Sequence, residues 1–455
     1  MDTVTRRHAG ALGLGAGLAP LGVLPAACGP GAAPAPARGG GEVRFLSWAG
    51  TWTPPMAPMF EQYQARTGTK ITVEMSASQT QHNEKLAAQL AAGTPPDAVL
   101  SVSQVDTKHY DSGAMLNLQA FVQRDKLNLR RDYALMGTEF WCDKLFGLPW
   151  HASPSAIFYN KTMLREAGVD DPWADGKADW TWDDLAATAR RVVRPAQGDD
   201  PGRWGVWWPY GNITYFGPHI WASGADFVDW ERTRWTLDAP GALEGFQRYS
   251  TWLVRERFAI SEPEATRVAQ QYSGKDLFSA GKVAFRFRLI DDVFTYLRTV
   301  GSDFEWDVLP VPRSGSRPGV GVHAAHPHII PAQTNVPDQA YEFIKFISGP
   351  EMQEFIGRNR ITLPGLKAKM STFLDPPPVA HARVFSDVYT RPYGIHFRHH
   401  NTFENWDQYG AVITPLLLGE RPLAAGLREL NEQMNARVAY GSCAPYKGLK
   451  HPIQP

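Results

Sequence analysis

The chain has 455 residues, which is enough for two or three domains or lobes rather than a single core. Its 46 basic and 46 acidic residues cancel to a formal net charge of zero, so the chain lacks the basic excess that favours binding to nucleic-acid phosphates. Aromatic residues are abundant, with 16 Trp, 15 Tyr and 22 Phe, and they suit both cores and the walls of clefts. After residue 42 the sequence has no run of the roughly 18 apolar residues that a membrane span needs.

The N-terminus is typical of an export signal. Residues 1–27 contain the pair Arg6 and Arg7, followed by an apolar stretch rich in Gly and Ala. Cys28 ends that stretch, as in the bacterial lipoprotein signal, in which the cysteine is lipidated and becomes residue one. The Arg pair also resembles a twin-arginine export signal, whereas Pro25 departs from the lipobox, which usually has Leu there. We expect residues 1–27 to direct export and Cys28 to carry a lipid anchor.

Residues 28–41 are expected to form a flexible tether, because their Gly, Pro and Ala cannot bury enough apolar area to fold. Two alternatives remain open for this region, namely cleavage after Ala37 and a tail with an incidental cysteine. The other cysteines are Cys142 and Cys443. In an oxidising compartment they either form a disulfide or remain two separate buried thiols.

The body of the chain begins with alternating strands and helices. Strands are predicted at 42–48, 70–75 and 97–102, and helices at 55–68 and 82–93, each helix ending at a glycine. This βαβ order predicts a parallel sheet with helices on both faces.

Three later segments also have clear helical signals. A helix at 180–193 begins at Thr181, with Asp184 placed to complete a capping box. The segment 335–350 carries an apolar helical face, and 422–439 predicts a final amphipathic helix. That apolar face consists of Ala340, Phe343, Ile344 and Ile347.

Six phrases of the sequence occur in a recognisable order and spacing. They are FGLPW (146–150), YNKTMLREAGV (159–169), WTWDDLAATARR (180–191), FSAGKVAFRF (278–287), WDVLPVP (306–312) and AYEFIKFISGPEMQEFIG (340–357). Together they resemble the extracellular solute-binding proteins (family 1) that serve ABC sugar importers, a family that includes maltose-binding protein. The resemblance covers essentially all of residues 42–440.

The resemblance implies an α/β, two-lobed periplasmic-binding-protein-like fold of type II, with the ligand cleft between the lobes and hinge crossings at its base. By analogy, one lobe would hold residues 42–152 and 314–368, and the other 153–313 and 369–455. Carboxyl ends of strands converge on a crevice in such folds, which is where ligands lie.

The resemblance also implies a function. The chain would capture a sugar or oligosaccharide, whose anionic or phosphorylated nature is left open, and present it to the permease subunits of an ABC transporter. It would be an exported monomer, in the periplasm or lipid-anchored at the outer face of the cytoplasmic membrane. It would need no cofactor and would not be an enzyme.

Sugars combine apolar faces with polar rims, so their sites pair flat aromatic rings with hydrogen-bonding side chains. By position relative to the family, candidate ligand-binding residues are Trp48, Trp52, Trp150, Tyr215 and Trp406. Polar candidates are Gln104 at a strand end, His326 as a hydrogen-bonding residue of the cleft, and Arg288 on a strand that in relatives runs into the cleft. For each aromatic residue the alternative is a place in a core or a surface loop.

Arg286 and Arg288 share one face of a predicted strand, because side chains alternate along a strand. Either guanidinium could bind an anionic ligand group, or Asp291, Asp292 or another carboxylate could hold them in structural ion pairs. Ser153 stands where maltose-binding protein has an acidic sugar ligand, which argues against identical specificity.

Two other classes of function were weighed. The sets His323, His326, His328 and His396, His399, His400 could suggest a metal-uptake protein, although neither has a carboxylate or cysteine at recognisable spacing. A secreted glycoside hydrolase would need two suitably spaced carboxylates, for which only Asp291 and Asp292 are worth inspecting. No metal site and no catalytic residue is predicted.

Overall fold

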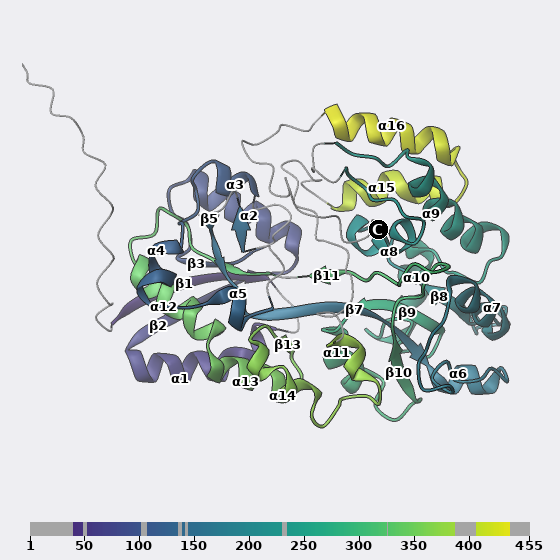
Figure 1. Ribbon diagram of the computed structural model, residues 1–455, viewed down its shortest axis with the longest axis horizontal. Helices are drawn as coiled ribbons and strands as arrows, with labels where there is room; N and C mark the ends of the chain where they lie inside the picture. The colour runs from purple at the N-terminus through teal and green to yellow at the C-terminus, as the bar shows by residue number, and fades with distance from the viewer. Residues whose placement is uncertain are drawn as a thin grey trace, which may run out of the picture.

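The protein is described here by a computed structural model that covers residues 40–48, 52–101, 107–134, 139–141, 144–229, 234–324, 326–386 and 406–436. Helices and strands alternate along these segments, and the ribbon divides into two lobes, each built around one larger sheet (Figure 1). The predicted two-lobed α/β architecture is therefore confirmed. Among the described helices, none is long and apolar enough to cross a membrane.

The first sheet begins as the sequence predicts. Its spatial order is β2 (Thr69–Ser76), β1 (Gly41–Trp48), β3 (Ala98–Leu100), β12 (His328–Ile329) and β6 (Gly147–Leu148). β1 runs parallel to both β2 and β3, which confirms the βαβ prediction. β12 then pairs antiparallel with β3 and with β6, so this sheet is mixed rather than wholly parallel.

Helices cover both faces of the first sheet because neighbouring residues of β1 point to opposite sides. Phe45 packs in a core with Phe343, whereas Leu46 packs on the other face with Leu86. The helices of this lobe are α1 (Ala57–Thr67), α2 (Gln79–Ala91), α3 (Thr107–Asp111), α4 (Gln119–Arg124), α5 (Leu129–Asp132), α12 (Pro337–Ser348) and α13 (Pro350–Arg358). Gly68 ends α1 at φ 72°, a left-handed conformation that glycine adopts without strain.

The second sheet is organised around β7 (His151–Asn160), all ten residues of which are buried. Its order is β10 (Trp306–Leu309), β7, β9 (Val283–Leu289) and β8 (Trp204–Trp207), and β11 (His323–Ala324) and β13 (Leu363–Pro364) pair with the first half of β7. In Figure 1, β7 runs from the first lobe into the second. A separate small hairpin joins β4 (Phe140–Trp141) and β5 (Lys144–Leu145).

The second sheet is also covered on both faces. Ile157 and Phe287 pack in one core, and Phe158 packs in another on the opposite face. The helices here are α6 (Lys161–Glu166), α7 (Trp182–Val192), α8 (Ile213–Trp221), α9 (Pro240–Ser250), α10 (Glu262–Ala269), α11 (Asp292–Thr299), α14 (Ser371–Leu374), α15 (Trp406–Leu417) and α16 (Leu423–Ala436). Thr181 and Asp184 form the predicted capping box of α7.

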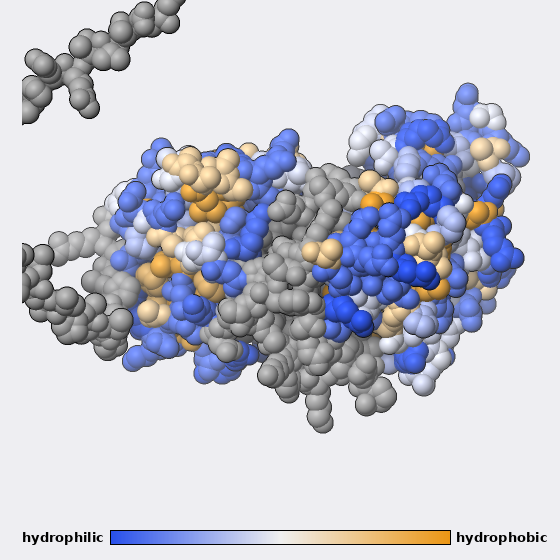
Figure 2. Space-filling view, turned by 90° about the horizontal axis from the view of Figure 1, so that it is seen from above, coloured by the Kyte–Doolittle hydropathy of each residue, from blue (hydrophilic) through white to orange (hydrophobic). Residues whose placement is uncertain are grey.

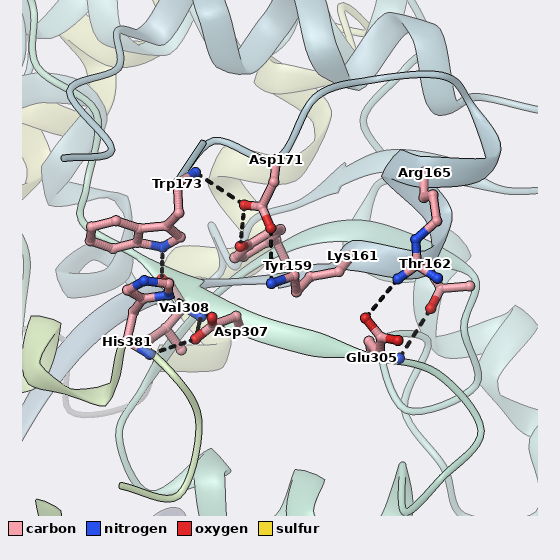
Figure 3. Close-up of polar contacts among 10 residues, drawn as sticks. All are labelled: Tyr159, Lys161, Thr162, Arg165, Asp171, Trp173, Glu305, Asp307, Val308 and His381. Atoms are coloured by element: carbon pink, nitrogen blue, oxygen red, sulfur yellow. Dashed lines mark hydrogen bonds and ion pairs between the residues drawn. The ribbon is translucent and has the colours of Figure 1, made fainter. Parts of the chain in front are cut away.

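Polar contacts fix the β10 edge of the second sheet (Figure 3). The ring of His381 stacks on Trp173 with centroids 3.9 Å apart, and its Nδ1 lies 2.7 Å from a carboxylate oxygen of Asp307. Trp173 Nε1 donates a hydrogen bond of 2.9 Å to the carbonyl of Val308. The chain that leaves α14 is therefore held to β10 before it reaches the C-terminal helices.

Both lobes present a largely hydrophilic surface in the view from above (Figure 2). Their main cores lie inside, one on each face of each sheet. The residue boundaries assigned to each lobe from the sequence remain a prediction.

Candidate ligand-binding site

The candidate residues gather where strands end. β1 and β3 are parallel and end at Trp48 and Leu100 in the first lobe, and β8 and β9 are parallel and end at Trp207 and Leu289 in the second. Ligands of open α/β sheets lie outside such carboxyl ends. The start of β7, from His151, lies between these two sets of residues, and we call this region the lobe junction.

On the first-lobe side of the junction, two tryptophans and a histidine make one aromatic cluster. The ring centroids of Trp48 and Trp52 are 5.8 Å apart, and that of His326 lies 5.1 Å from Trp48 and 5.3 Å from Trp52. Trp48 and His326 are buried, whereas Trp52 is partly exposed. The structure thus brings three predicted site residues together, and Trp52 is the ring that solvent reaches.

Trp150 packs against this cluster from the first-lobe core. Its side chain is fully buried in the first-lobe core, 5.7 Å from the ring of Trp52, and its Nε1 donates a hydrogen bond of 2.7 Å to the His326 carbonyl. This place suits a core residue that fixes Trp52 rather than a ring that itself meets a ligand.

His326 is held as a neutral imidazole. Its Nδ1 lies 3.1 Å from the carbonyl oxygen of Ser101, and burial lowers its pKa to about 4. Burial also lowers the pKa of His82, whose ring lies 5.1 Å from Trp48, to about 4. Near neutral pH this side of the junction is therefore aromatic and uncharged.

Two predicted residues meet on the second-lobe side. The Cζ atom of Arg288 lies 5.7 Å from the ring centroid of Tyr215, a half-buried residue of α8. Arg288 donates from Nε to Asp292 at 2.5 Å and from Nη2 to the same carboxylate at 3.3 Å. Of the two alternatives that the sequence left for Arg288, the structure shows the structural ion pair.

Asp291 is a buried carboxyl group between the lobes. It accepts a hydrogen bond from the hydroxyl of Ser153 on β7. Thr362 and Trp52 also face the carboxyl, but of these three side chains only Ser153 forms a hydrogen bond with it. All three favour the ionised form and so act to lower the pKa. Burial is the larger effect and raises the pKa of Asp291 to about 6. Sequence reasoning had considered this residue only as an arginine partner or half of a hydrolase pair.

Other junction residues were missed. His151 lies 4.9 Å from the ring of Trp52, and Thr362 precedes β13 beside the start of β7. No local pattern marks them, because their position depends on strand pairing between distant segments. Trp207 could have been suspected, because it is the last residue of β8 and begins the aromatic run at 207–216.

Several predictions fall outside the described residues. They concern Gln104, Cys28, Cys142, Cys443, His396, His399, His400 and the side chain of Trp406, whose backbone begins α15. Within the described segments, no group of three or more His, Cys, Asp or Glu side chains is arranged to hold a metal ion. Burial lowers the pKa of His323 and of His328 to about 3.

Three surface hollows lie away from the junction. Two of them, of 320 and 630 Å³, share Thr162 and Asp303 at the outer end of the second lobe. A third, of 400 Å³, lies beside α4 in the first lobe. None of these three hollows is lined by the tryptophans of the junction. In the hollow of 320 Å³, Glu166 is paired with Arg203, and Lys275 with Asp303.

Two α/β lobes with aromatic and polar side chains at their junction define a periplasmic-binding-protein-like receptor. The sequence matches the family described as bacterial extracellular solute-binding protein over residues 49–354, which is most of the chain. The chain belongs to that family, as the six sequence phrases predicted. Its members are binding proteins rather than enzymes.

The curated relatives that the chain matches are distant in sequence. A putative binding protein of Brucella abortus (strain 2308) is 25% identical over 200 residues, which are 44% of this chain and 46% of the relative. The match therefore spans about half the length of that relative.

Solved structures share the fold more completely. An ABC substrate-binding protein of Listeria monocytogenes in complex with cycloalternan gives a TM-score of 0.73 at 20% identity, covering 87% of this chain and 98% of that one. The GacH receptor of Streptomyces glaucescens, studied with acarbose, gives 0.70 at 16% identity, with 88% and 100% covered. Maltose-bound MalE3 of T. maritima gives 0.70 at 16%, with 87% and 99% covered. These similarities show a common fold.

Proposed function

We propose that the protein is the substrate-binding component of an ABC importer, which captures a sugar or oligosaccharide between its lobes and presents it to membrane permease subunits. The observation that carries this proposal is the lobe junction itself. There the partly exposed ring of Trp52, on the first-lobe side, faces the carboxyl of Asp291 at the end of β9. Sugars suit such a pairing of flat rings with polar groups. The named similar structures that hold cycloalternan, maltose or acarbose support the same substrate class.

A ligand that touches both lobes would favour a closed arrangement, because it binds that arrangement better than an open one. Moving such an equilibrium from 1:99 to 99:1 takes about 5.5 kcal/mol of differential binding. Stacking on Trp52 and several hydrogen bonds across the junction can supply this amount. The closed shape would then be the signal that a permease reads.

The proposal includes export, with residues 1–27 as the signal and Cys28 as the lipid anchor at the outer face of the cytoplasmic membrane or in the periplasm. It also includes a monomeric, non-catalytic protein. Asp291 and Asp292 make a poor pair for glycoside hydrolysis, since Asp292 is held in a bidentate ion pair with Arg288. A hydrolase needs one carboxylate free to act as nucleophile or base.

The test is a thermal-shift screen of the mature chain with maltose, maltotriose, mannotriose and sugars that carry a carboxylate or phosphate. Titration calorimetry follows for any sugar that raises Tm. Trp52→Ala should lower the affinity for a stabilising sugar about 10-fold or more, because it removes the accessible ring. Trp173→Ala, which removes a ring from the distant β10 edge, should leave the affinity unchanged.

The same samples should be assayed for new reducing ends. Recovery of the sugar intact supports a receptor, whereas steady release of reducing ends would establish a hydrolase instead. Binding that survives Trp52→Ala and falls with Trp173→Ala would place the ligand elsewhere.

A further inference from the structure

Arg286 is a buried cation without a carboxylate partner among the described residues. Its side chain is only 5% exposed, and its Cζ atom lies 3.3 Å from the ring centroid of Trp207. Among the described residues, its hydrogen bonding consists of a long contact of 3.4 Å from Nη1 to the Trp207 carbonyl, and its buried Nε has no partner there. A buried guanidinium normally has an ion pair, because an uncompensated charge is costly in a protein interior.

Three acids whose charges act on Arg286 are engaged with other groups. Asp292 pairs with Arg288, and Asp276 accepts hydrogen bonds from the hydroxyl of Tyr296 and the backbone of Ser279. Glu262 accepts from the backbone N–H of Gly211 at 2.7 Å. Burial and the like charge of Arg288 lower the pKa of Arg286, whereas the negative charges of Asp276 and Asp292 act in the opposite direction.

A second arginine shows why burial matters. Arg298 also lies over an aromatic ring, with Cζ 3.4 Å from the centroid of Phe294 and Nη1 2.9 Å from its carbonyl oxygen. Arg298 is exposed, so water satisfies the rest of its guanidinium. Arg286 has the same ring contact without that solvent. The difference indicates that Arg286 has a task beyond stacking.

The position of Arg286 suits contact with a ligand. It is paired in register with Trp207, the last residue of β8, and it lies two residues before Arg288 on the same face of β9. Both strands end at the lobe junction, the edge where ligands of such sheets lie. The Tyr215 ring beside Arg288 offers a flat surface within reach of the same edge.

We propose that Arg286 is the counter-ion for an acidic group, carboxylate or phosphate, on the solute that the protein binds. The inference rests on the proposed function, since it names the chemical class of the sugar captured at the junction. It also moves the anion-binding role from Arg288, which is neutralised by Asp292, to the neighbouring arginine. Arg guanidinium groups suit this role because their donors match the oxygens of carboxylate and phosphate.

The experiment uses the mature chain and four probes at matched ionic strength: glucose, glucuronate, glucose 6-phosphate and inorganic phosphate. Thermal shift gives the response, and titration calorimetry gives the affinity. We expect the acidic sugars to raise Tm more than glucose does. Arg286→Met should weaken their binding on the order of 10- to 100-fold, the usual effect of losing a charged hydrogen-bond partner. Comparing the affinities for glucuronate and glucose 6-phosphate shows whether the site prefers a carboxylate or a phosphate.

Two further variants make the result specific. Arg286→Lys keeps the charge and should retain part of the anion response, and Arg298→Met should retain all of it. The free Arg286→Met protein should be at least as stable as wild type, because an uncompensated buried charge has been replaced by an apolar chain. If Arg286→Met fails to fold, two measurements still test the inference. They are the wild-type comparison of acidic with neutral sugars and the anion response of Arg286→Lys.

Three results would overturn the inference: acidic sugars that bind no better than glucose, equal losses with Arg286→Met and Arg298→Met, or an anion response that Arg286→Met leaves intact. Binding of neutral sugars alone would sink this inference and leave the proposed function standing. Phosphate binding that depends on Arg286, without binding of any sugar, would support the anion site and contradict the proposed function.

Discussion

Individual charges at the lobe junction differ in how well they are compensated. Arg288 has a carboxylate within 2.5 Å. Among the described residues, Arg286 has no carboxylate partner, and the Asp291 carboxylate accepts one hydrogen bond, from Ser153. The alternation of the sequence places the two arginines on one strand and Asp291 just after it. It does not predict which arginine forms an ion pair with the neighbouring carboxylates. That choice depends on the turn between β9 and α11, which brings Asp292 back onto Arg288.

The raised pKa of Asp291 gives a stability prediction. Its pKa is about 6 in the folded protein against an ordinary value of 3.8, so ionisation opposes folding. The penalty is absent below pH 4, grows as pH rises, and is complete above pH 6, where it reaches about 3 kcal/mol. Asp291→Asn should therefore be more stable than wild type at pH 7.5, with an advantage that disappears toward pH 4. Urea unfolding at both pH values measures it.

Asp292→Asn provides the matched comparison. It breaks the bidentate pair with Arg288 and should destabilise the protein at pH 7.5 rather than stabilise it. An Asp291→Asn variant that loses stability at pH 7.5 to the same extent would show that its carboxylate is compensated in the fold.

At the scale of elements, local signals were reliable wherever the physical cause is local. Glycine at the end of α1 and the capping box of α7 depend on a few neighbouring residues, and both were predicted correctly. The apolar face of α12 was also predicted correctly, since Phe343 and its neighbours recur at helical spacing. β12 and β6 carry no comparable signal, because each is two residues long and is defined by its partner.

The capping box of α7 can be tested directly. Thr181→Ala removes the hydroxyl that accepts from the backbone N–H of Asp184, and should lower the free energy of unfolding by about 1 kcal/mol. Urea unfolding at pH 7.5 measures the loss. Thr266→Ala on the exposed side of α10 should change stability by a few tenths of a kcal/mol at most, because that hydroxyl bonds only within its own helix. Equal losses in the two variants would contradict the role assigned to the cap.

At the scale of the whole molecule, the two-lobed fold followed from the family resemblance more than from any single element. The βαβ start predicted one parallel sheet, and the six phrases predicted the second lobe. The sequence could also gather Trp48, Trp52, Trp150 and His326 as site candidates, and the structure places these four rings together. It could not separate the exposed ring from the buried ones, since exposure is set by packing between distant segments. For the same reason His151 and Thr362 were not anticipated.

The central claim is that one ligand is held by both lobes at once. Hydrogen-exchange mass spectrometry of the mature chain, with and without the sugar that gives the largest thermal shift, tests this most directly. The account predicts slower exchange in two places together, around Trp52 in the first lobe and from Trp207 to Tyr215 in the second. Protection confined to a single lobe, or centred on the outer hollow around Thr162 and Asp303, would contradict it.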